Sequence, residues 1–309
     1  MKTVVVVGAT GQQGRSVVNA VLASPQLRSQ YSLRGTTRDL GQVQARELVA
    51  EGVEMVAADV NDPDSLRRAF TGAEVVFANC VTIYDGRALQ HEIEHGHAMA
   101  DAAVAARVPF IIYSTLPHAG NLSGGRLQDM GHFDGKAEVE AYIRTLPIRS
   151  AFVAPGSFMS NFHASMAPHP MGEGVYALAT PVPPETQLPL IDTLGDLGKW
   201  VAAILEDFGA YEGKVLCCAT GLYSFSQIVE TMSRLSGKQV VYKQVPEEVW
   251  KGFLPPLMRD HLADMLRYFH ELGYYGPDTQ ERVQWSAAQA KGGLTTLEEY
   301  LEAHPLRLE

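Results

Sequence analysis

Cysteine is scarce in this chain of 309 residues, which has three. A sparse and odd number excludes a scaffold built on disulfides and predicts a reducing compartment. Cys217 and Cys218 lie in an apolar run and are expected to be buried in a strand. No spacing typical of metal ligands occurs, and His91, His95 and His97 are expected on the polar face of a helix. The sequence therefore predicts no metal site.

Basic residues are also in the minority. The chain has 25 lysines and arginines against 35 aspartates and glutamates, and its formal net charge is −10. Proteins that hold nucleic acid through its phosphates carry a basic face, so direct nucleic-acid binding is not expected. No apolar run reaches the length of a membrane span, and the first 15 residues lack a secretory pattern because a strand begins at once. These absences predict a cytoplasmic protein, with the nucleus as a second location.

Strand-like and helix-like segments alternate through the first half of the chain. This alternation predicts an α/β fold with a doubly wound parallel Rossmann sheet, in which ligands lie at the carboxyl ends of the strands. Asp62 is expected to cap the helix that begins at Pro63. Strands are expected at 4–7, 32–37, 54–58, 75–79, 110–114 and 149–154, and helices at 14–22, 42–51, 63–70, 91–106 and 133–144.

The second half has a different character. Residues 155–190 contain seven of the 17 prolines and little clear periodicity, which is typical of loops that cover a site. We predict an NAD(P)-binding domain over 1–156 and a smaller α/β lobe over 157–309. The two are expected to be interleaved, because the chain returns to the sheet near 190–220. From residue 195 onward we expect helices at 195–207, 226–237 and 296–304 and strands at 214–219 and 240–244. Further helical segments are expected within 246–273.

Three glycines follow the first strand. An apolar run, Val4–Val7, leads into Gly8, Gly11 and Gly14, and then into a helix. In such a loop the first glycine permits a tight turn, the second lets the backbone approach phosphates, and the third lets the helix pack closely on the strand. The free N–H groups and the positive end of the helix dipole then meet an anion. The loop predicts a dinucleotide site, and its glycine spacing resembles that of extended and atypical short-chain dehydrogenases.

The end of the second strand predicts which dinucleotide is bound. An acidic residue there binds the ribose hydroxyls of NAD, whereas a nearby arginine accommodates the 2′-phosphate of NADP. Arg38 follows the strand directly, beside the hydroxyl of Thr37, and a guanidinium suits bidentate contact with phosphate. We therefore predict NADP(H). In the alternative interpretation, Arg38 is a solvated surface charge and Asp39 binds the ribose.

The ends of the third and fourth strands are expected to complete the cofactor site. Asp59, with Val60, is placed to meet the adenine, and its alternative role is in the turn before the next helix. Asn79 ends the fourth strand and is expected to line the nicotinamide half.

The catalytic pattern of short-chain dehydrogenases is present only in part. These enzymes commonly use a Tyr-x-x-x-Lys pair on one helix face and a serine after the fifth strand. Ser114 and Lys136 are in place, but His132 occupies the tyrosine position. An imidazole can move a proton at neutral pH, although its reach is shorter than that of a phenol. In the alternative, Lys136 only binds the cofactor and His132 is a packing or capping residue.

Several segments together resemble the NmrA-like family, an atypical branch of the short-chain dehydrogenases. The resemblance covers nearly the whole chain and implies cofactor contacts from Thr10, Gln12, Gln13, Arg38, Asp59, Lys136, Phe158 and Asn161. On the residues alone, Phe158 is as well explained as a core residue and Asn161 as a polar loop residue. The segments are 8–14, Tyr113-Ser114, 125–127, His132-Phe133-Asp134-Gly135-Lys136 with Glu138, Val139, Glu140 and Tyr142, then 157–162, 188–192 and 196–198.

The resemblance implies more than one kind of function. Some members are sensors that bind NADP(H), change conformation or association, and regulate a partner without reducing anything. Some restrain a transcription factor through protein contacts. Others are reductases in which the helix lysine serves catalysis without the tyrosine. The segment from His132 to Lys136 is nearest to the sensor branch.

Two hypotheses follow, and the first is slightly favoured. In the first, the chain is an NADP(H) sensor whose cofactor orders loops such as 123–130 and 158–190 and shifts the population toward a state that binds a regulatory protein partner. In the second, it is an NADPH-dependent reductase of a small hydrophobic carbonyl, enone or imine, with Lys136, His132 and Ser114 as candidate catalytic residues. A homodimer is compatible with either. Phe253, Tyr268, Phe269, Tyr274 and Tyr275 motivate the second hypothesis, although core packing is the expected role of most of them.

Overall fold

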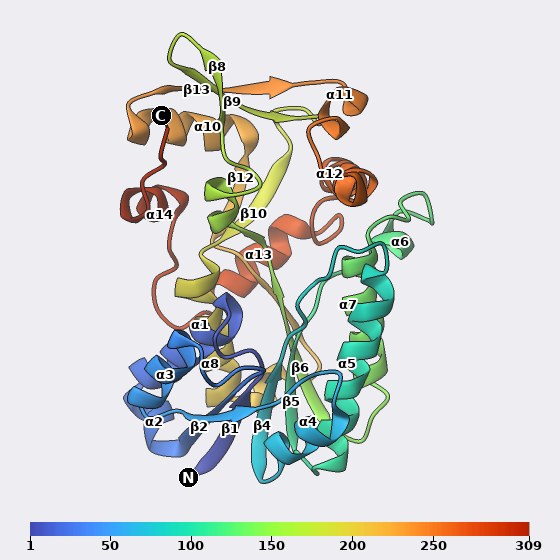
Figure 1. Cartoon of the computed structure of the whole chain (residues 1–309), viewed down its shortest axis with the longest axis vertical. Helices are drawn as coiled ribbons and strands as arrows, with labels where there is room; N and C mark the ends of the chain where they lie inside the picture. Colours follow the sequence, from blue (N-terminus) through green and yellow to red (C-terminus); the bar gives the residue numbers. More distant parts are fainter. Residues whose placement is uncertain (309) are drawn as a thin grey trace.

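A seven-stranded sheet forms the frame on which the candidate site is built. A computed structural model describes residues 1–308, and the order of strands in this sheet is β11-β6-β5-β4-β1-β2-β3. All neighbouring strands are parallel (Figure 1). The order along the chain reverses between β1 and β4, and at such a switch point an α/β sheet opens a crevice for a ligand. The strands are β1 (Lys2–Val6), β2 (Tyr31–Thr37), β3 (Glu54–Ala57), β4 (Ala73–Ala78), β5 (Phe110–Ser114), β6 (Arg149–Pro155) and β11 (Val215–Cys218).

Helices cover both faces of this sheet because its strands are apolar on both sides. In β1, Val4 and Val6 belong to the apolar cluster of one face and Val5 to that of the other. The helices approach one another closely: a Cβ added to Gly198 would lie 2.1 Å from the carbonyl oxygen of Ser16. One face carries α1 (Gln12–Ala23), α2 (Pro25–Gln30), α3 (Val43–Ala50), α8 (Thr193–Glu206) and α9 (Phe208–Tyr211), and the other α4 (Pro63–Phe70), α5 (Ala88–Ala105) and α7 (Gly131–Ile143). We call the sheet with these helices the large lobe.

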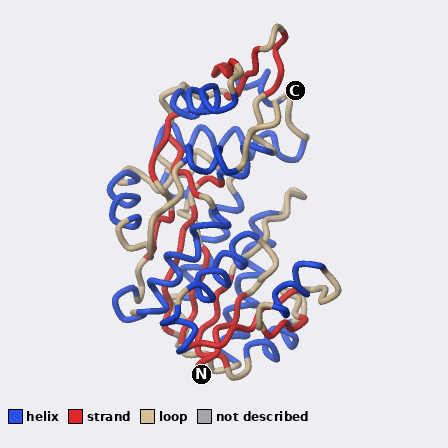
Figure 2. Tube along the Cα trace, turned by 90° about the vertical axis from the view of Figure 1, so that its left-hand side faces the viewer, coloured by secondary structure: helices blue, strands red, loops and turns tan. Residues whose placement is uncertain are grey.

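A small lobe lies beyond the carboxyl ends of these strands (Figures 1 and 2). It contains two three-stranded sheets, β12-β10-β7 and β13-β9-β8, around an apolar core of its own. Its strands are β7 (Ser157–Phe158), β8 (His169–Gly172), β9 (Val175–Thr180), β10 (Gln187–Ile191), β12 (Gly221–Ser224) and β13 (Gln239–Gln244). Its helices are η1 (Met159–His163), α10 (Phe225–Ser236), α11 (Glu247–Lys251), η2 (Pro256–Met258), α12 (Arg259–Leu272), α13 (Thr279–Ala287) and α14 (Leu297–Ala303), and the short α6 (Ala119–Leu122) precedes α7.

The chain passes between the lobes more than once. After β10 it returns to the large lobe as α8 and β11, and it then leaves again into β12. The returning strand pairs with β6, with Leu216 opposite Val153. The predicted fold class is therefore confirmed, including the interleaved second lobe. The division at residue 156 stays a prediction.

Predicted elements of the first half lie within three residues of the observed ones, and α4 and β5 match throughout. Asp62 caps α4 by accepting a hydrogen bond from the backbone N–H of Ser65. The interpretation of 155–190 as loops was incomplete, because this segment supplies β7, η1, β8, β9 and most of β10. A proline and a short length conceal the pattern in β8 and in β10. The prediction for His95 was wrong: its ring is buried and stacks on that of His91. Within residues 1–308, no helix has both the length and the apolar character needed to cross a membrane.

Candidate functional site at the carboxyl edge of the large sheet

The glycine loop adopts the tight geometry that its sequence predicts. Gly8 has a φ of +65°, in the left-handed region that favours glycine. A Cβ on Gly14 would lie 2.3 Å from the carbonyl oxygen of Gly8, so only glycine lets α1 approach the loop this closely. Gly11 donates its N–H to the same carbonyl oxygen at 2.9 Å. The loop is therefore held by contacts that any added side chain at Gly14 would break.

The amino end of α1 is prepared for an anion. Its N-cap, Gly11, offers no side-chain hydrogen bond, and the first turn contains no acidic residue. The first N–H groups of a helix have no partner within the helix, and the helix dipole adds positive potential there. Thr10 is half-buried and Gly11 exposed at this point. Together these features suit a phosphate group, as the amino ends of helices do in dinucleotide folds.

The two glutamines of the loop connect it to its surroundings. Gln13 accepts a hydrogen bond from the Ser114 hydroxyl at 2.8 Å, at the carboxyl end of β5. Gln12 accepts one from the Ser160 hydroxyl at 3.3 Å, in η1. The loop thus contacts the small lobe as well as the sheet. Ser114, a candidate catalytic residue, is engaged by Gln13.

Three predicted residues of the adenosine half lie at the carboxyl ends of β2 and β3, on the side of β1 that is away from β4. They are Arg38, Asp59 and Val60. The Arg38 side chain is exposed, and it forms no ion pair with any other residue of 1–308. Asp39 instead accepts a hydrogen bond from the N–H of Gly41 at 2.8 Å, which forms a local turn. A hydrogen bond from the N–H of Asn61 lowers the pKa of Asp59, and the Arg38 charge acts in the same direction. Val60 is half-buried against the neighbouring apolar cluster.

Lys136 forms a buried ion pair. Its Nζ lies 2.8 Å from Oε2 of Glu92 on α5, and the two side chains are 7% and 1% exposed. Nζ also donates to the carbonyl oxygen of Cys80 at 3.4 Å, just after β4. The Thr82 hydroxyl donates to Oε1 of Glu92 at 2.6 Å. The ammonium is therefore fixed beside the switch point of the sheet, and its charge is balanced there.

His132 lies one helical turn before Lys136 and is buried. Its Nδ1 is shielded from solvent and has no hydrogen-bond partner among residues 1–308. Burial, with smaller effects from His261 and Lys136, holds the pKa of His132 well below its ordinary value, so the ring is neutral at pH 7. The ring centroid lies 4.5 Å from that of His261 on α12. The residue at the tyrosine position thus packs at the junction of the two lobes.

Tyr84 covers this pair of histidines. It belongs to the loop 79–87 that follows β4, and its ring centroid lies 6.1 Å from that of His132 and 5.2 Å from that of His261. His261 Nδ1 lies 2.6 Å from the carbonyl oxygen of Asp129. The opposite nitrogen, Nε2, is buried and finds no hydrogen-bond partner in the described part of the chain. We call His132, Tyr84 and His261 the lobe-junction cluster.

The remaining predicted cofactor residues lie at the same edge. Asn79 follows β4 beside the glycine loop, since a Cβ on Gly8 would lie 3.5 Å from its Oδ1. Phe158 is half-buried and packs against the cluster that contains Val17 of α1. Asn161 is half-buried in η1, and its carbonyl oxygen accepts the N–H groups of Ala164 and Met166. The fold therefore brings all the predicted site residues to one edge of the sheet, and their roles stay predictions.

Three residues of the site were missed from the sequence. Glu92 is one of three carboxylates in an alanine-rich helix, Tyr84 lies in a loop, and His261 lies in a region for which only helical segments were expected. One signal in the sequence could have identified Glu92: it shares a helix face with residues expected to be buried. A buried carboxylate needs a partner of opposite charge or a hydrogen-bond donor. Of the aromatic residues proposed to surround a substrate, all but one are buried in the small lobe core, and only Phe253 is exposed.

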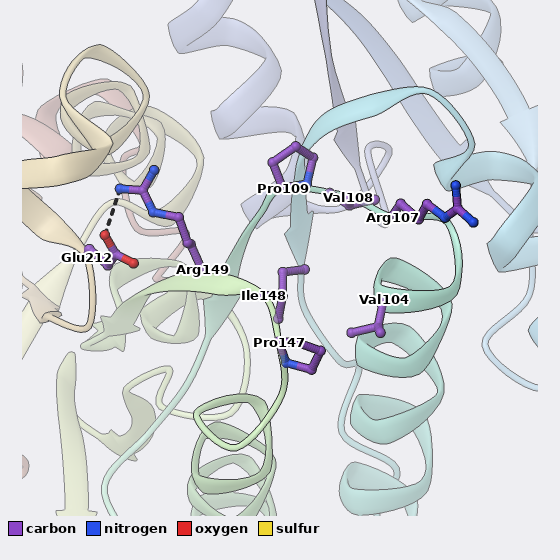
Figure 3. Close-up of a pocket in the computed structure, with 8 residues that line it drawn as sticks. All are labelled: Val104, Arg107, Val108, Pro109, Pro147, Ile148, Arg149 and Glu212. Atoms are coloured by element: carbon purple, nitrogen blue, oxygen red, sulfur yellow. Dashed lines mark hydrogen bonds and ion pairs between the residues drawn. The ribbon is translucent and has the colours of Figure 1, made fainter.

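A hollow of about 530 Å³ lies elsewhere on the large lobe (Figure 3). It is lined by residues that precede or begin β5 and β6, among them Arg107, Pro109 and Pro147. Figure 3 also shows Arg149 paired with Glu212 at 2.6 Å. These are the amino ends of the strands, whereas the glycine loop is at the carboxyl ends. The hollow is therefore not part of the candidate site.

Comparison with known proteins agrees with this geometry. The NmrA-like family model matches residues 1–301. An NmrA-like family domain-containing oxidoreductase, ptmS of Penicillium ochrochloron, is 30% identical over 82% of this chain and 78% of its own length. The nitrogen metabolite repression protein nmrA of Emericella nidulans is 28% identical over 87% of this chain and 76% of its own.

A solved structure extends the likeness to the whole fold. The crystal structure of NmrA, a negative transcriptional regulator, in complex with NADP superposes with a TM-score of 0.82. It is 25% identical in sequence, and the match covers 99% of this chain and 95% of that one. The chain belongs to the NmrA-like family.

Proposed function

We propose that this member of the NmrA-like family is an NADP(H) sensor that regulates a protein partner. The residues of the carboxyl edge fit a dinucleotide: α1 begins without a side-chain cap or an acidic residue, and there is no room for a Cβ on Gly14. The NADP complex of NmrA supports the choice of cofactor. Gly8, Gly11 and Gly14 with Thr10, Gln12 and Gln13 would hold the pyrophosphate side. Arg38, Asp59 and Val60 would hold the adenosine side, and Asn79, Lys136, Phe158 and Asn161 the nicotinamide side.

Arg38 tests the choice between the phosphorylated and unphosphorylated cofactor. We expect Arg38→Ala to weaken NADPH binding by about 10- to 100-fold, because charge-assisted bonds to phosphate are each worth on the order of 1.5–3 kcal/mol. NADH affinity should change by less than about threefold, since NADH has no 2′-phosphate. Isothermal titration calorimetry measures both. Arg28→Ala, an exposed arginine near the other end of β2, is the control. Unchanged NADPH binding in Arg38→Ala would show that the assignment is wrong.

The main observation in support of a sensor, rather than an enzyme, is that His132 is buried. Short-chain dehydrogenases commonly place their proton donor four residues before the helix lysine, where it can reach the substrate. Here Nδ1 of His132 is closed off and the ring lies against Tyr84 and His261. The His132 ring is therefore better placed to pack between the two lobes than to transfer a proton to a substrate.

Through the same contacts, cofactor binding could change the position of the small lobe. Helix α7 carries both Lys136 and His132, and the loop that precedes α7 is bonded to α12. Asp129 binds His261 through its carbonyl oxygen, and Arg126 pairs with Glu271 at 2.9 Å. A cofactor that favours one placement of α7 would therefore also favour one placement of α12. We propose that the partner is a protein rather than nucleic acid, given the net charge of −10, and that it is met in the cytoplasm or the nucleus.

Hydrogen exchange with and without cofactor tests this function. With saturating NADPH we expect amide exchange in 123–130 and in the first turns of α12 to slow by about tenfold or more, with no NADPH consumed across a panel of quinones, carbonyls, enones and imines. His261→Leu should retain NADPH binding and lose the protection of α12. His169→Leu, on the exposed β8, is the matched control. Equal exchange with and without NADPH, together with an unchanged association state, would contradict the proposal.

A reductase is the second candidate, and the buried Lys136–Glu92 pair favours it. Several curated relatives have names that include oxidoreductase. When bound, NADPH supplies a hydride. Lys136 would then orient the cofactor and hold a proton-bearing water beside the acceptor. Turnover of any compound in the panel that disappears in Lys136→Ala would replace the sensor with this enzyme, whereas turnover that persists in Lys136→Ala would remove this mechanism.

A further inference from the structure

Glu92 is the least exposed charged side chain near the candidate site. Its side chain is 1% exposed, and both carboxylate oxygens are engaged, one by Lys136 at 2.8 Å and the other by Thr82 at 2.6 Å. The backbone of α7 comes close at this point: a Cβ on Gly135 would lie 2.6 Å from the Cβ of Glu92. The carboxylate is therefore held between α7 and the loop after β4, with little freedom to move.

The pair lies where the nicotinamide half of a dinucleotide is expected. In a doubly wound sheet the two halves of the cofactor lie on either side of the switch point between β1 and β4. The phosphate loop and Arg38 occupy the β1–β2 side. Lys136 is hydrogen-bonded to the carbonyl oxygen of Cys80, directly beyond β4. The charges of Lys136 and Glu92 thus lie on the side of the sheet where the nicotinamide, the half of the cofactor whose charge changes with oxidation, would bind.

Electrostatics then distinguish the two forms of the cofactor. The nicotinamide ring is positively charged when oxidised and neutral when reduced. A lone buried ammonium beside it would repel the oxidised form strongly, because charges interact over several ångströms where water is excluded. The Lys136–Glu92 pair is neutral as a whole. If both forms bind, they compete for one site, and the fraction of sites that holds each form then depends on their ratio.

We propose that Glu92 is a positioning residue that neutralises Lys136 and thereby lets the site accept oxidised as well as reduced NADP(H). Glu92 also ties the loop 79–87, through Thr82, to the same point. The inference rests on the proposed function, since it concerns how the sensor reads its cofactor. It adds that a residue outside the cofactor contacts sets the preference for one oxidation state.

The test compares dissociation constants rather than activity. NADPH, NADP⁺ and 2′,5′-ADP are titrated against the full chain and its variants. In Glu92→Gln we expect the ratio of the NADP⁺ to the NADPH dissociation constant to rise by about tenfold, since Lys136 is left without a counter-charge. In Glu92→Gln/Lys136→Met, which removes both charges, the ratio should return to within about threefold of the original. Glu94→Gln, an exposed carboxylate on the same helix, should leave the ratio unchanged.

Each outcome has one meaning. Binding of 2′,5′-ADP, which lacks the nicotinamide, reports whether a variant still folds with its adenosine side intact. If the unmodified chain binds neither NADPH nor NADP⁺, the proposed function fails. If it binds both, and Glu92→Gln weakens them equally or not at all, Glu92 has a merely structural role and the inference is overturned.

Discussion

Replacing Gly14 with alanine is expected to weaken NADPH binding by about 100-fold or more. The added Cβ would lie 2.3 Å from the carbonyl oxygen and 2.7 Å from the carbonyl carbon of Gly8. Both are backbone atoms that cannot rotate away, so the amino end of α1 must move outward. Forced packing of this kind costs about 1–3 kcal/mol, and displaced N–H groups no longer point at the phosphates. Calorimetry or quenching of protein fluorescence by NADPH gives the affinity.

The control for this variant is Gly293→Ala. Gly293 lies between α13 and α14 and does not have a positive φ. Apart from its two chain neighbours, no described residue has an atom within 4 Å of an added Cβ. It should bind NADPH as the original chain does, with unfolding free energy changed by less than about 0.5 kcal/mol. Circular dichroism separates lost binding from lost folding in Gly14→Ala. A folded Gly14→Ala variant with normal NADPH affinity would contradict the assignment of the glycine loop as the phosphate site.

The second large effect concerns stability. Replacing Glu92 with leucine is expected to lower the free energy of unfolding by about 3–5 kcal/mol, because it leaves the Lys136 ammonium buried without a counter-charge. The loss includes the hydrogen bond from Thr82. In Glu92→Leu/Lys136→Met both charges are gone, and the free energy should return to within about 1–2 kcal/mol of the original. Urea denaturation followed by circular dichroism measures all of these.

A surface pair provides the comparison. Lys2 and Glu74 are 2.8 Å apart, but Lys2 is 59% exposed, so Lys2→Met should cost less than about 1 kcal/mol. The interpretation would be wrong if the two single changes, Glu92→Leu and Lys2→Met, had similar effects. It would also be wrong if the double variant were as unstable as Glu92→Leu, because the cost would then come from packing rather than charge.

Local patterns in the sequence were sufficient for much of the fold. The run Val4–Val7, the glycines at 8, 11 and 14, and the Asp62-Pro63 pair each act through neighbouring residues, so their outcomes can be read without tertiary contacts. The small lobe was harder to predict. Its strands β8 and β10 contain prolines and are short, and β12 has four residues, so no periodic pattern could identify them.

The sequence by itself determined the parallel α/β fold, the glycine loop and the positions of Arg38, Ser114, His132 and Lys136, because these depend on spacing along one strand, turn or helix. Only the tertiary structure decided what Lys136 and His132 contact. Glu92 lies 44 residues before Lys136, and His261 lies 129 residues after His132. Such pairs form because α5 packs on α7 and because α12 folds back onto the large lobe. No local rule fixes the register of two packed helices, so the balanced charge at the candidate site emerged only from the folded chain.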